Sequence, residues 1–379
     1  MIIVVLGAGT MGSGIAQFFA QKNQKVILVD SNKESLIKAK NNIDFSVQQL
    51  VNKQKITTQE AGMIMKNLSF SNEISSLANS ELVVEAIIEN LEIKQQVFKE
   101  VENIVSEKCV LCTNTSSLSI ASISSCLGRP ERFFGMHFFN PATIMPLVEL
   151  VPSIRTDIEQ VKKIKTILED WGKSPVICKD TPGFIVNRIA RPFYGEALRI
   201  YEEGIANFET IDFAMTHLGE FKMGPFQLMD YIGNDINYTV SETVFSSFYF
   251  DPRFKPSFTQ KRYVEAGLLG RKTQHGFYNY KEEVSELEIN KDQKLLDEIF
   301  FRILAMLINE AYDAYYLKIA SREDIELAMT KGVNYPKGLI QWSEEIGVKK
   351  IYSTLSQLFS DYGEDRYRPN VMLKRLVNK

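Results

Sequence analysis

Short apolar runs alternate with helical patterns along the first half of the chain. An apolar run of about four to eight residues is typical of a buried strand, whereas apolar positions three or four residues apart are typical of a helix. The runs that we expect to form strands are Ile2–Leu6, Val26–Asp30, Leu82–Ala86, Val110–Thr113, Phe133–His137 and Leu147–Val151. This alternation predicts an α/β fold in which helical crossovers join the strands of a parallel sheet.

The segment 32–72 is too long for one crossover helix and is rich in Lys, Asn and Gln. We therefore expect a helical hairpin that projects from the sheet. Further along, T-P-G-F-I-V-N-R at Thr181–Arg188 places Pro and Gly directly before a helical pattern. Such a segment indicates a domain boundary, and helical patterning dominates beyond it.

The helical half contains an internal repeat. The stretch E-A-L-R-I-Y that starts at Glu196 matches E-A-Y-D-A-Y at Glu310, and identical residues continue in register at an offset of 114 residues. The register extends to the pairs Gly224 with Gly338 and Gly233 with Gly347. A repeat of this length predicts a second copy of a small helical domain.

The amino-acid composition and net charge indicate a globular protein. The chain has 379 residues, 45% of them hydrophobic, and a net charge of −3 without a block of Lys or Arg. These values are typical of a globular protein and argue against nucleic acid or an anionic membrane as a partner. No apolar run is long enough to span a bilayer, so we expect a cytoplasmic protein.

Four cysteines, Cys109, Cys112, Cys126 and Cys178, raise the question of a metal site. Cys109 and Cys112 have CxxC spacing, but the residues between them continue an apolar run and no second pair or nearby histidine completes a tetrahedral set. We predict that these two cysteines are reduced, buried or half-buried strand residues and that they bind no metal.

The glycine loop G-A-G-T-M-G at Gly7–Gly12 follows the first expected strand and opens a helix. In a dinucleotide site Gly7 would allow the tight turn, Gly9 the approach of a pyrophosphate, and Gly12 close helix–strand packing. The helix N-terminus would supply amide donors to the phosphates. We therefore predict a Rossmann-type domain, with Thr10 and Met11 of the loop and Ala86 as further cofactor contacts.

Asp30 ends the second expected strand. A carboxylate at this position can accept hydrogen bonds from ribose hydroxyls and would repel the additional phosphate of NADP, although it could also serve as a helix cap. We predict NAD as the cofactor. The predicted domains are 1–182 (NAD-binding), 183–285 (helical, for substrate and dimerisation) and 286–379 (a degenerate helical copy).

Four polar residues lie at strand ends or at the domain boundary: Ser116, His137, Glu149 and Asn187. Ligands of open α/β sheets bind beyond the carboxyl ends of the strands, so Ser116 and His137 should converge there. A charge such as Glu149 inside an apolar run needs a partner, and a histidine held by a carboxylate can accept a hydroxyl proton. The other two histidines, His217 and His275, are expected to be structural.

The sequence resembles the L-3-hydroxyacyl-CoA dehydrogenase family in seven motifs that occur in order over roughly residues 1–280. They are G-A-G-T-M-G-S-G-I-A-Q, V-V-E-A-I-I-E-N-L-E-I-K, T-N-T-S-S-L-S-I, H-F-F-N-P, T-P-G-F-I-V-N-R, G-P-F-Q-L-M-D and G-R-K-T-Q-H-G-F-Y-N-Y. The second helical copy resembles the repeated C-terminal domain of the family.

The resemblance implies oxidation of a (S)-3-hydroxyacyl-CoA, with His137 as the general base and Glu149 as its orienting carboxylate. It further implies that Ser116 and Asn187 hydrogen-bond the reacting oxygen and the thioester. The contacts implied with the cofactor are Glu89, Lys94, Asn114, Asn140 and Ser116, and those with coenzyme A are Ser46 and Lys53, for which a solvated helix face is an alternative.

The second copy departs from the family motif because Phe301 stands at the position equivalent to Asn187. We expect this copy to be structural and to take the place of a dimer partner within one chain, so that the protein is a monomer or a homodimer. Two other functions stay open: a relative that acts on a free hydroxy or sugar acid, and a non-catalytic dinucleotide-binding protein. The sequence does not reveal the acyl chain length or whether the acyl group is dicarboxylic.

Overall fold

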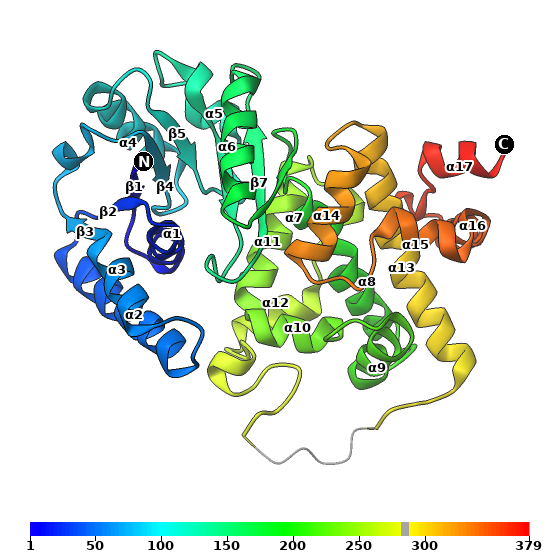
Figure 1. The fold of residues 1–379 in the computed structure, drawn as a ribbon. Helices are drawn as coiled ribbons and strands as arrows, with labels where there is room; N and C mark the ends of the chain where they lie inside the picture. The colour runs from blue at the N-terminus through cyan, green and yellow to red at the C-terminus, as the bar shows by residue number, and fades with distance from the viewer. Residues whose placement is uncertain (282–287, 379) are drawn as a thin grey trace. The chain divides into compact units, whose positions relative to one another are not determined.

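The computed structural model describes residues 1–281 and 288–378. The chain divides into two compact units, Met1–Thr181 and Pro182–Lys379. The first is an α/β unit and the second is helical (Figure 1), which confirms the predicted fold class. The division falls at the start of the T-P-G-F segment.

The first unit contains an eight-stranded sheet with the order β3-β2-β1-β4-β5-β6-β7-β8. The strands are β1 (Ile2–Leu6), β2 (Lys25–Val29), β3 (Leu68–Ser71), β4 (Leu82–Glu85), β5 (Val110–Thr113), β6 (Phe133–Phe138), β7 (Leu147–Pro152) and β8 (Ser174–Ile177). Neighbouring strands are parallel except for β6 and β7, which are antiparallel. The prediction of a parallel sheet is wrong at this pair. The connection 139–146 is too short for a crossover, which needs about a dozen residues.

The six predicted strands are confirmed to within one residue at each end, but the sequence reading missed β3 and β8. In β3 only Leu68 is buried, so the strand has no continuous apolar run. In β8 the residue Pro175 cannot donate to a ladder, and proline normally argues against a strand.

The predicted hairpin consists of α2 (Lys33–Asn52) and α3 (Thr58–Lys66), which lie side by side (Figure 1). Thr57 and Glu60 form a capping box that starts α3. One apolar face of α2 is buried in the core through Leu36, Ala39, Ile43 and Val47. The hairpin is shorter than predicted, because residues 68–71 belong to β3. The remaining helices of the first unit are α1 (Thr10–Gln21), α4 (Leu91–Ile104), α5 (Ile120–Ser124) and α6 (Ile158–Asp170), with 3-10 turns η1 (Ile74–Leu77) and η2 (Pro130–Arg132).

The second unit repeats its helices along the chain. The earlier set is α7 (Val186–Ile189), α8 (Arg191–Glu202), α9 (Phe208–Gly219), α10 (Pro225–Ile232), α11 (Asn234–Ser247), η3 (Pro252–Phe254), α12 (Phe258–Glu265) and η4 (Arg271–Thr273). The later set is α13 (Gln293–Tyr316), α14 (Arg322–Gly332), α15 (Leu339–Ile346), α16 (Val348–Tyr362), η5 (Asp365–Tyr367) and α17 (Val371–Val377). The bounds of α15 equal those of α10 shifted by 114 residues. The predicted boundary at 285/286 lies outside the described residues, so the three-domain division stays a prediction.

Equivalent residues also shape the chain in the two sets. Gly233 and Gly347 precede α11 and α16 with φ angles of 104° and 97°, a conformation that favours glycine. The Asp212 carboxylate accepts hydrogen bonds from the first turn of α10, and its equivalent Glu326 accepts one from Gln341 in α15.

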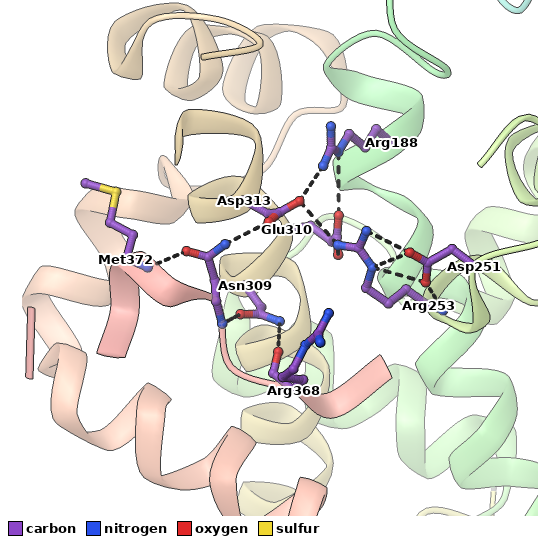
Figure 2. A network of polar contacts seen from close by, with 9 residues as sticks. Arg188, Asp251, Arg253, Asn309, Glu310, Asp313, Arg368 and Met372 are labelled. Carbon is purple, nitrogen blue, oxygen red and sulfur yellow. Dashed lines mark hydrogen bonds and ion pairs between the residues drawn. The ribbon is translucent and has the colours of Figure 1, made fainter. Parts of the chain in front are cut away.

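The two helical sets pack through α13, which lies against α7, α8 and α9. Arg188 of α7 donates to Asp313 at 2.5 Å and lies 3.6 Å from Glu310, both on α13 (Figure 2). In the reciprocal pair, Arg302 of α13 lies 2.7 Å from Glu196 of α8. The offset of 114 residues relates Arg188 to Arg302 and Glu196 to Glu310. The arginine of each helical set therefore pairs with the glutamate of the other set, at equivalent positions.

Candidate active site

The glycine loop joins β1 to α1 and leaves one side open for a ligand. Gly7 has a φ angle of 100°, and a Cβ atom on it would lie 2.5 Å from the Ala86 carbonyl oxygen. A Cβ atom on Gly12 would lie 1.8 Å from the Gly7 carbonyl oxygen, whereas one on Gly9 would meet no atom within 4 Å. Gly7 and Gly12 are therefore required by packing, and Gly9 leaves room for the close approach of a phosphate group. No side chain caps α1, which begins at Thr10.

A cavity of about 650 Å³ lies on one side of this loop. It is lined by Gly7, Gly9, Asp30 and Ala86 among others. The Asp30 carboxylate accepts hydrogen bonds from the Ala8 amide at 2.7 Å and the Asn32 amide at 2.9 Å, directly after β2. An open glycine loop, an uncapped helix N-terminus and a carboxylate at the second strand fit a dinucleotide.

His137 and Glu149 lie opposite each other on the antiparallel strands β6 and β7. The His137 Nδ1 atom is 2.7 Å from Glu149 Oε2, and the two residues are only 7% and 0% exposed. The prediction that they occupy adjacent strands is confirmed. When Nδ1 donates to this carboxylate, the neutral ring carries its accepting lone pair on Nε2, which is the arrangement of a general base.

A second polar cluster, buried at Glu85 and Lys94 but exposed at Glu89, lies at the carboxyl ends of β4 and β5. The Lys94 ammonium, 1% exposed, is 2.5 Å from the Glu85 carboxylate and 3.2 Å from that of Glu89. Glu89 also accepts hydrogen bonds from Thr115 and, at 2.8 Å, from the Ser117 hydroxyl. Burial acts to raise the pKa of Glu89, but the Lys94 charge and these hydrogen bonds outweigh it and hold that pKa below its ordinary value. The cluster therefore carries a carboxylate and fixes the loop after β5.

Glu89 and Lys94 are among the residues predicted from the sequence, whereas Glu85 and the threonines Thr113 and Thr115 are not. Glu85 accepts a hydrogen bond from Thr113 at 2.6 Å and is completely buried. The signal was available, because Glu85 is a charge inside an apolar strand, as Glu149 is.

Three further predicted residues follow the carboxyl ends of two neighbouring strands: Asn114 and Ser116 follow β5, and Asn140 follows β6. The Ser116 amide donates to Glu89 at 3.3 Å, so the cluster holds the backbone of the predicted catalytic serine. The Asn114 side chain accepts from the Phe138 amide at 2.8 Å, next to His137. The first unit thus brings together the loop of Ser116 and the His137–Glu149 pair at the end of β4, β5 and β6, whereas Asn187 belongs to the second unit, on α7.

A smaller cavity of about 390 Å³ touches the other side of the glycine loop and contains two further predicted residues. Ser46 and Asn140 line it together with Gly9 and Thr10. The Ser46 hydroxyl accepts a hydrogen bond from Gln17 at 3.1 Å. Lys53 follows α2 as its C-cap residue, is exposed, and is not one of the residues that line this cavity.

The other residues singled out in the sequence have structural surroundings. Cys109 and Cys112 are fully buried, the first directly before β5 and the second within it, and the four cysteines are free thiols. His217 stacks on Phe213 in α9 at 4.9 Å. Among the described residues, no helix is both long and apolar enough to cross a membrane.

Together, the fold and site define a nucleotide-dependent dehydrogenase with a histidine–carboxylate pair. Residues 2–181 match the model of the 3-hydroxyacyl-CoA dehydrogenase NAD binding domain, and residues 183–280 and 299–379 match that of the 3-hydroxyacyl-CoA dehydrogenase C-terminal domain. The chain belongs to the 3-hydroxyacyl-CoA dehydrogenase family. This confirms the resemblance seen in the sequence and NAD as the cofactor.

Relatives cover the chain in full or in part. The 3-hydroxyadipyl-CoA dehydrogenase of Escherichia coli K12 is 34% identical, with 98% of this chain and 96% of the relative aligned. The mitochondrial hydroxyacyl-coenzyme A dehydrogenase of Sus scrofa is 39% identical over 74% of this chain and 91% of its own length. The crystal structure of 3-hydroxybutyryl-CoA dehydrogenase from E. coli K12 superposes with a TM-score of 0.94 at 33% identity, covering 99% of this chain and 98% of the other.

Proposed function

We propose that the chain catalyses the reversible oxidation of a (S)-3-hydroxyacyl-CoA to the 3-oxoacyl-CoA, with His137 as the general base. The observation that supports this most is the buried His137–Glu149 pair. It lies at the carboxyl end of β6, and the glycine loop follows the carboxyl end of β1 in the same sheet. NAD, when bound, accepts the hydride that leaves C3 of the substrate.

In this proposal His137 takes the C3 hydroxyl proton on Nε2 while Nδ1 donates to Glu149. The buried carboxylate keeps the ring in one tautomer and stabilises the imidazolium that forms. Ser116 and Asn187 donate hydrogen bonds to the reacting oxygen and the thioester, which favours the polarised transition state. The Glu85–Lys94–Glu89 cluster holds the Ser116 loop in place and would present Glu89 to the cofactor.

The coenzyme A moiety would bind beside α2, where Ser46 lines the smaller cavity and Lys53 offers a positive charge. A relative that acts on a free acid would not need these residues. The test is the rate of NADH oxidation with acetoacetyl-CoA compared with free acetoacetate. We expect turnover of the thioester alone. Turnover of the free acid at an equal or higher kcat/KM would contradict the proposal.

The second helical copy would take the place of a dimer partner. The exchanged pairs Arg188–Glu310 and Arg302–Glu196 support this. In a two-fold symmetric dimer, a contact between residue i of one subunit and residue j of the other is always accompanied by the reverse contact. We also keep a cytoplasmic location as a prediction, based on the cysteine content of the sequence. The E. coli relative is a 3-hydroxyadipyl-CoA dehydrogenase, which makes a dicarboxylic acyl group one candidate for the substrate of this chain.

A further inference from the structure

The cavity of about 650 Å³ beside the glycine loop has aliphatic walls in addition to its glycines and Asp30. Segments that follow four neighbouring strands, in the sheet order β3-β2-β1-β4, line it together. The aliphatic side chains among its lining residues are those of Leu6, Val29, Ile74, Ile87, Ile88, Ile93 and Val97. Two carboxylates line it, those of Asp30 and Glu100.

Several of these aliphatic side chains face the cavity and not the core. Ile88, which follows β4, is 66% exposed, and Ile93 of α4 is 40% exposed. Ile74 of η1, which follows β3, is half-buried. Because β3 and β4 flank β2 and β1 in the sheet, the two isoleucines Ile74 and Ile88 lie on opposite sides of the strand ends that carry Asp30 and the glycine loop. Such walls suit a flat, largely apolar ligand.

Glu100 stands at the end of an aliphatic stripe on α4. Phe98 and Val101 belong to the buried face of this helix. Ile93, Val97 and Glu100 are separated by four and three residues, so they share a neighbouring face, and all three line the cavity. The helix therefore presents two aliphatic side chains and one carboxylate to the same space.

The Glu100 carboxylate has no role in holding the described fold together. Glu100 is exposed, and it has no hydrogen bond or ion pair within residues 1–281 and 288–378. By contrast, Glu102 on the same helix accepts hydrogen bonds from the Gly128 and Arg129 amides. An ionised carboxylate can only accept hydrogen bonds, so the group that suits Glu100 is an N–H or O–H donor of a ligand in the cavity.

The chemistry of the cofactor determines which of its parts lies there. In a Rossmann-type site the pyrophosphate lies at the glycine loop and the adenosine ribose at the acidic residue after the second strand, here Asp30. The Asp30 carboxylate accepts the Ala8 and Asn32 amides on different oxygens, and each oxygen keeps a lone pair for a ribose hydroxyl. The adenine base is joined directly to this ribose, so it reaches the aliphatic part of the same cavity.

We propose that the adenine of NAD packs against Ile88 and the Ile93–Val97 stripe, and that Glu100 accepts a hydrogen bond from its 6-amino group. Glu100 is then a specificity residue for the base. Hypoxanthine and guanine carry a carbonyl oxygen at this position, which cannot donate and which a carboxylate repels. The inference rests on the cofactor site of the proposed function, but it concerns the adenine end of NAD and not the reacting end.

The test compares NADH with reduced nicotinamide hypoxanthine dinucleotide, which carries a carbonyl oxygen in place of the 6-amino group. Equilibrium titration of the full chain measures the Kd of each. We expect the wild type to bind NADH about tenfold more tightly, the scale of one hydrogen bond to a charged group. In Glu100→Gln the preference should fall to about twofold or less, because the glutamine amide can donate to the carbonyl oxygen. A wild type without preference, or a preference that Glu100→Gln retains in full, would overturn the proposal.

Glu92→Gln is the matched control, because it removes the same charge from the first turn of α4 and Glu92 does not line the cavity. This variant should keep the wild-type ratio of the two Kd values. An equal loss of preference in Glu92→Gln would show a general effect of charge and would also overturn the assignment of Glu100.

Ile88→Ala tests the position of the base separately. The aliphatic wall contacts adenine and hypoxanthine alike, so both Kd values should rise by the same factor while their ratio stays unchanged. Unchanged Kd values for both dinucleotides would contradict the placement of the base in this part of the cavity.

These titrations use no thioester, so they separate this inference from the proposed function. The predicted Kd ratios in a chain that oxidises no 3-hydroxyacyl-CoA would support the Glu100 site and contradict the proposed function. Oxidation of the thioester by a chain without base preference would contradict the Glu100 site alone.

Discussion

Arg302 donates from Nε to Oε1 of Glu196 at 2.7 Å, and this pair joins the later helical set of the second unit to the earlier one. Glu196 is completely buried, and it also accepts hydrogen bonds from Arg199 and the Tyr367 hydroxyl. Its equivalent, Glu310, is approached in the same way by Arg188 and Arg253 (Figure 2). The two helical sets of one chain thus contact each other through equivalent residues, as the two subunits of a symmetric dimer would.

Glu196→Gln should destabilise the second unit by about 3 kcal/mol, because it removes the completely buried carboxylate that faces Arg199 and Arg302. Glu203→Gln is the matched control, since Glu203 pairs with the same Arg302 but is 27% exposed at its side chain. Urea unfolding of the two variants measures the difference. Equal loss of unfolding free energy in both variants would contradict a central role for the buried pair.

The same residue predicts a dependence of stability on acid pH. Burial acts to raise the pKa of Glu196, but Arg199, Arg302 and the Tyr367 hydrogen bond outweigh it and lower the pKa below its ordinary value. A carboxylate with a depressed folded-state pKa contributes stability that is present above its unfolded pKa, about 4.3, and is lost as the pH falls through the folded value. The difference in unfolding free energy between wild type and Glu196→Gln should therefore be constant from about pH 6 to 8, where the Glu196 carboxylate is ionised in both the folded and the unfolded state. Below about pH 4 this difference should shrink. A difference that stays constant in acid would contradict the ionised state of Glu196.

Asp30 should determine the choice between NAD and NADP. Asp30→Asn removes the charge that would repel the additional phosphate of NADP but keeps an oxygen that can accept the Ala8 amide. We expect the ratio of kcat/KM for NADP to that for NAD to rise at least about tenfold, since juxtaposed like charges cost several kcal/mol. Thermal unfolding of the variant controls for loss of the two backbone hydrogen bonds. An unchanged ratio would mean that Asp30 acts only as a support for the loop.

Much of the fold could be predicted because the strongest signals are local. The strands around Val110 and Phe133 are continuous apolar runs, and the glycine loop needs a turn that few other sequences can make. The strand at Pro175 could not be predicted, because its pairing with β7 is decided by tertiary contacts and not by its own residues.

For the site, His137 and Glu149 could be predicted as a pair because an isolated charge in an apolar run demands a partner. The Lys94 environment could not be predicted, since its ion pair with Glu85 depends on how α4 lies against β4.

Turnover of the His137→Gln variant tests most directly whether His137 is the general base. Glutamine keeps a polar side chain of similar length, but it cannot accept the hydroxyl proton. We predict that kcat for 3-hydroxyacyl-CoA oxidation falls by about 10²–10⁴-fold, the usual contribution of a general base, while the Kd of NADH stays within a few-fold of wild type. A variant that retains wild-type kcat with unchanged NADH binding would contradict the account.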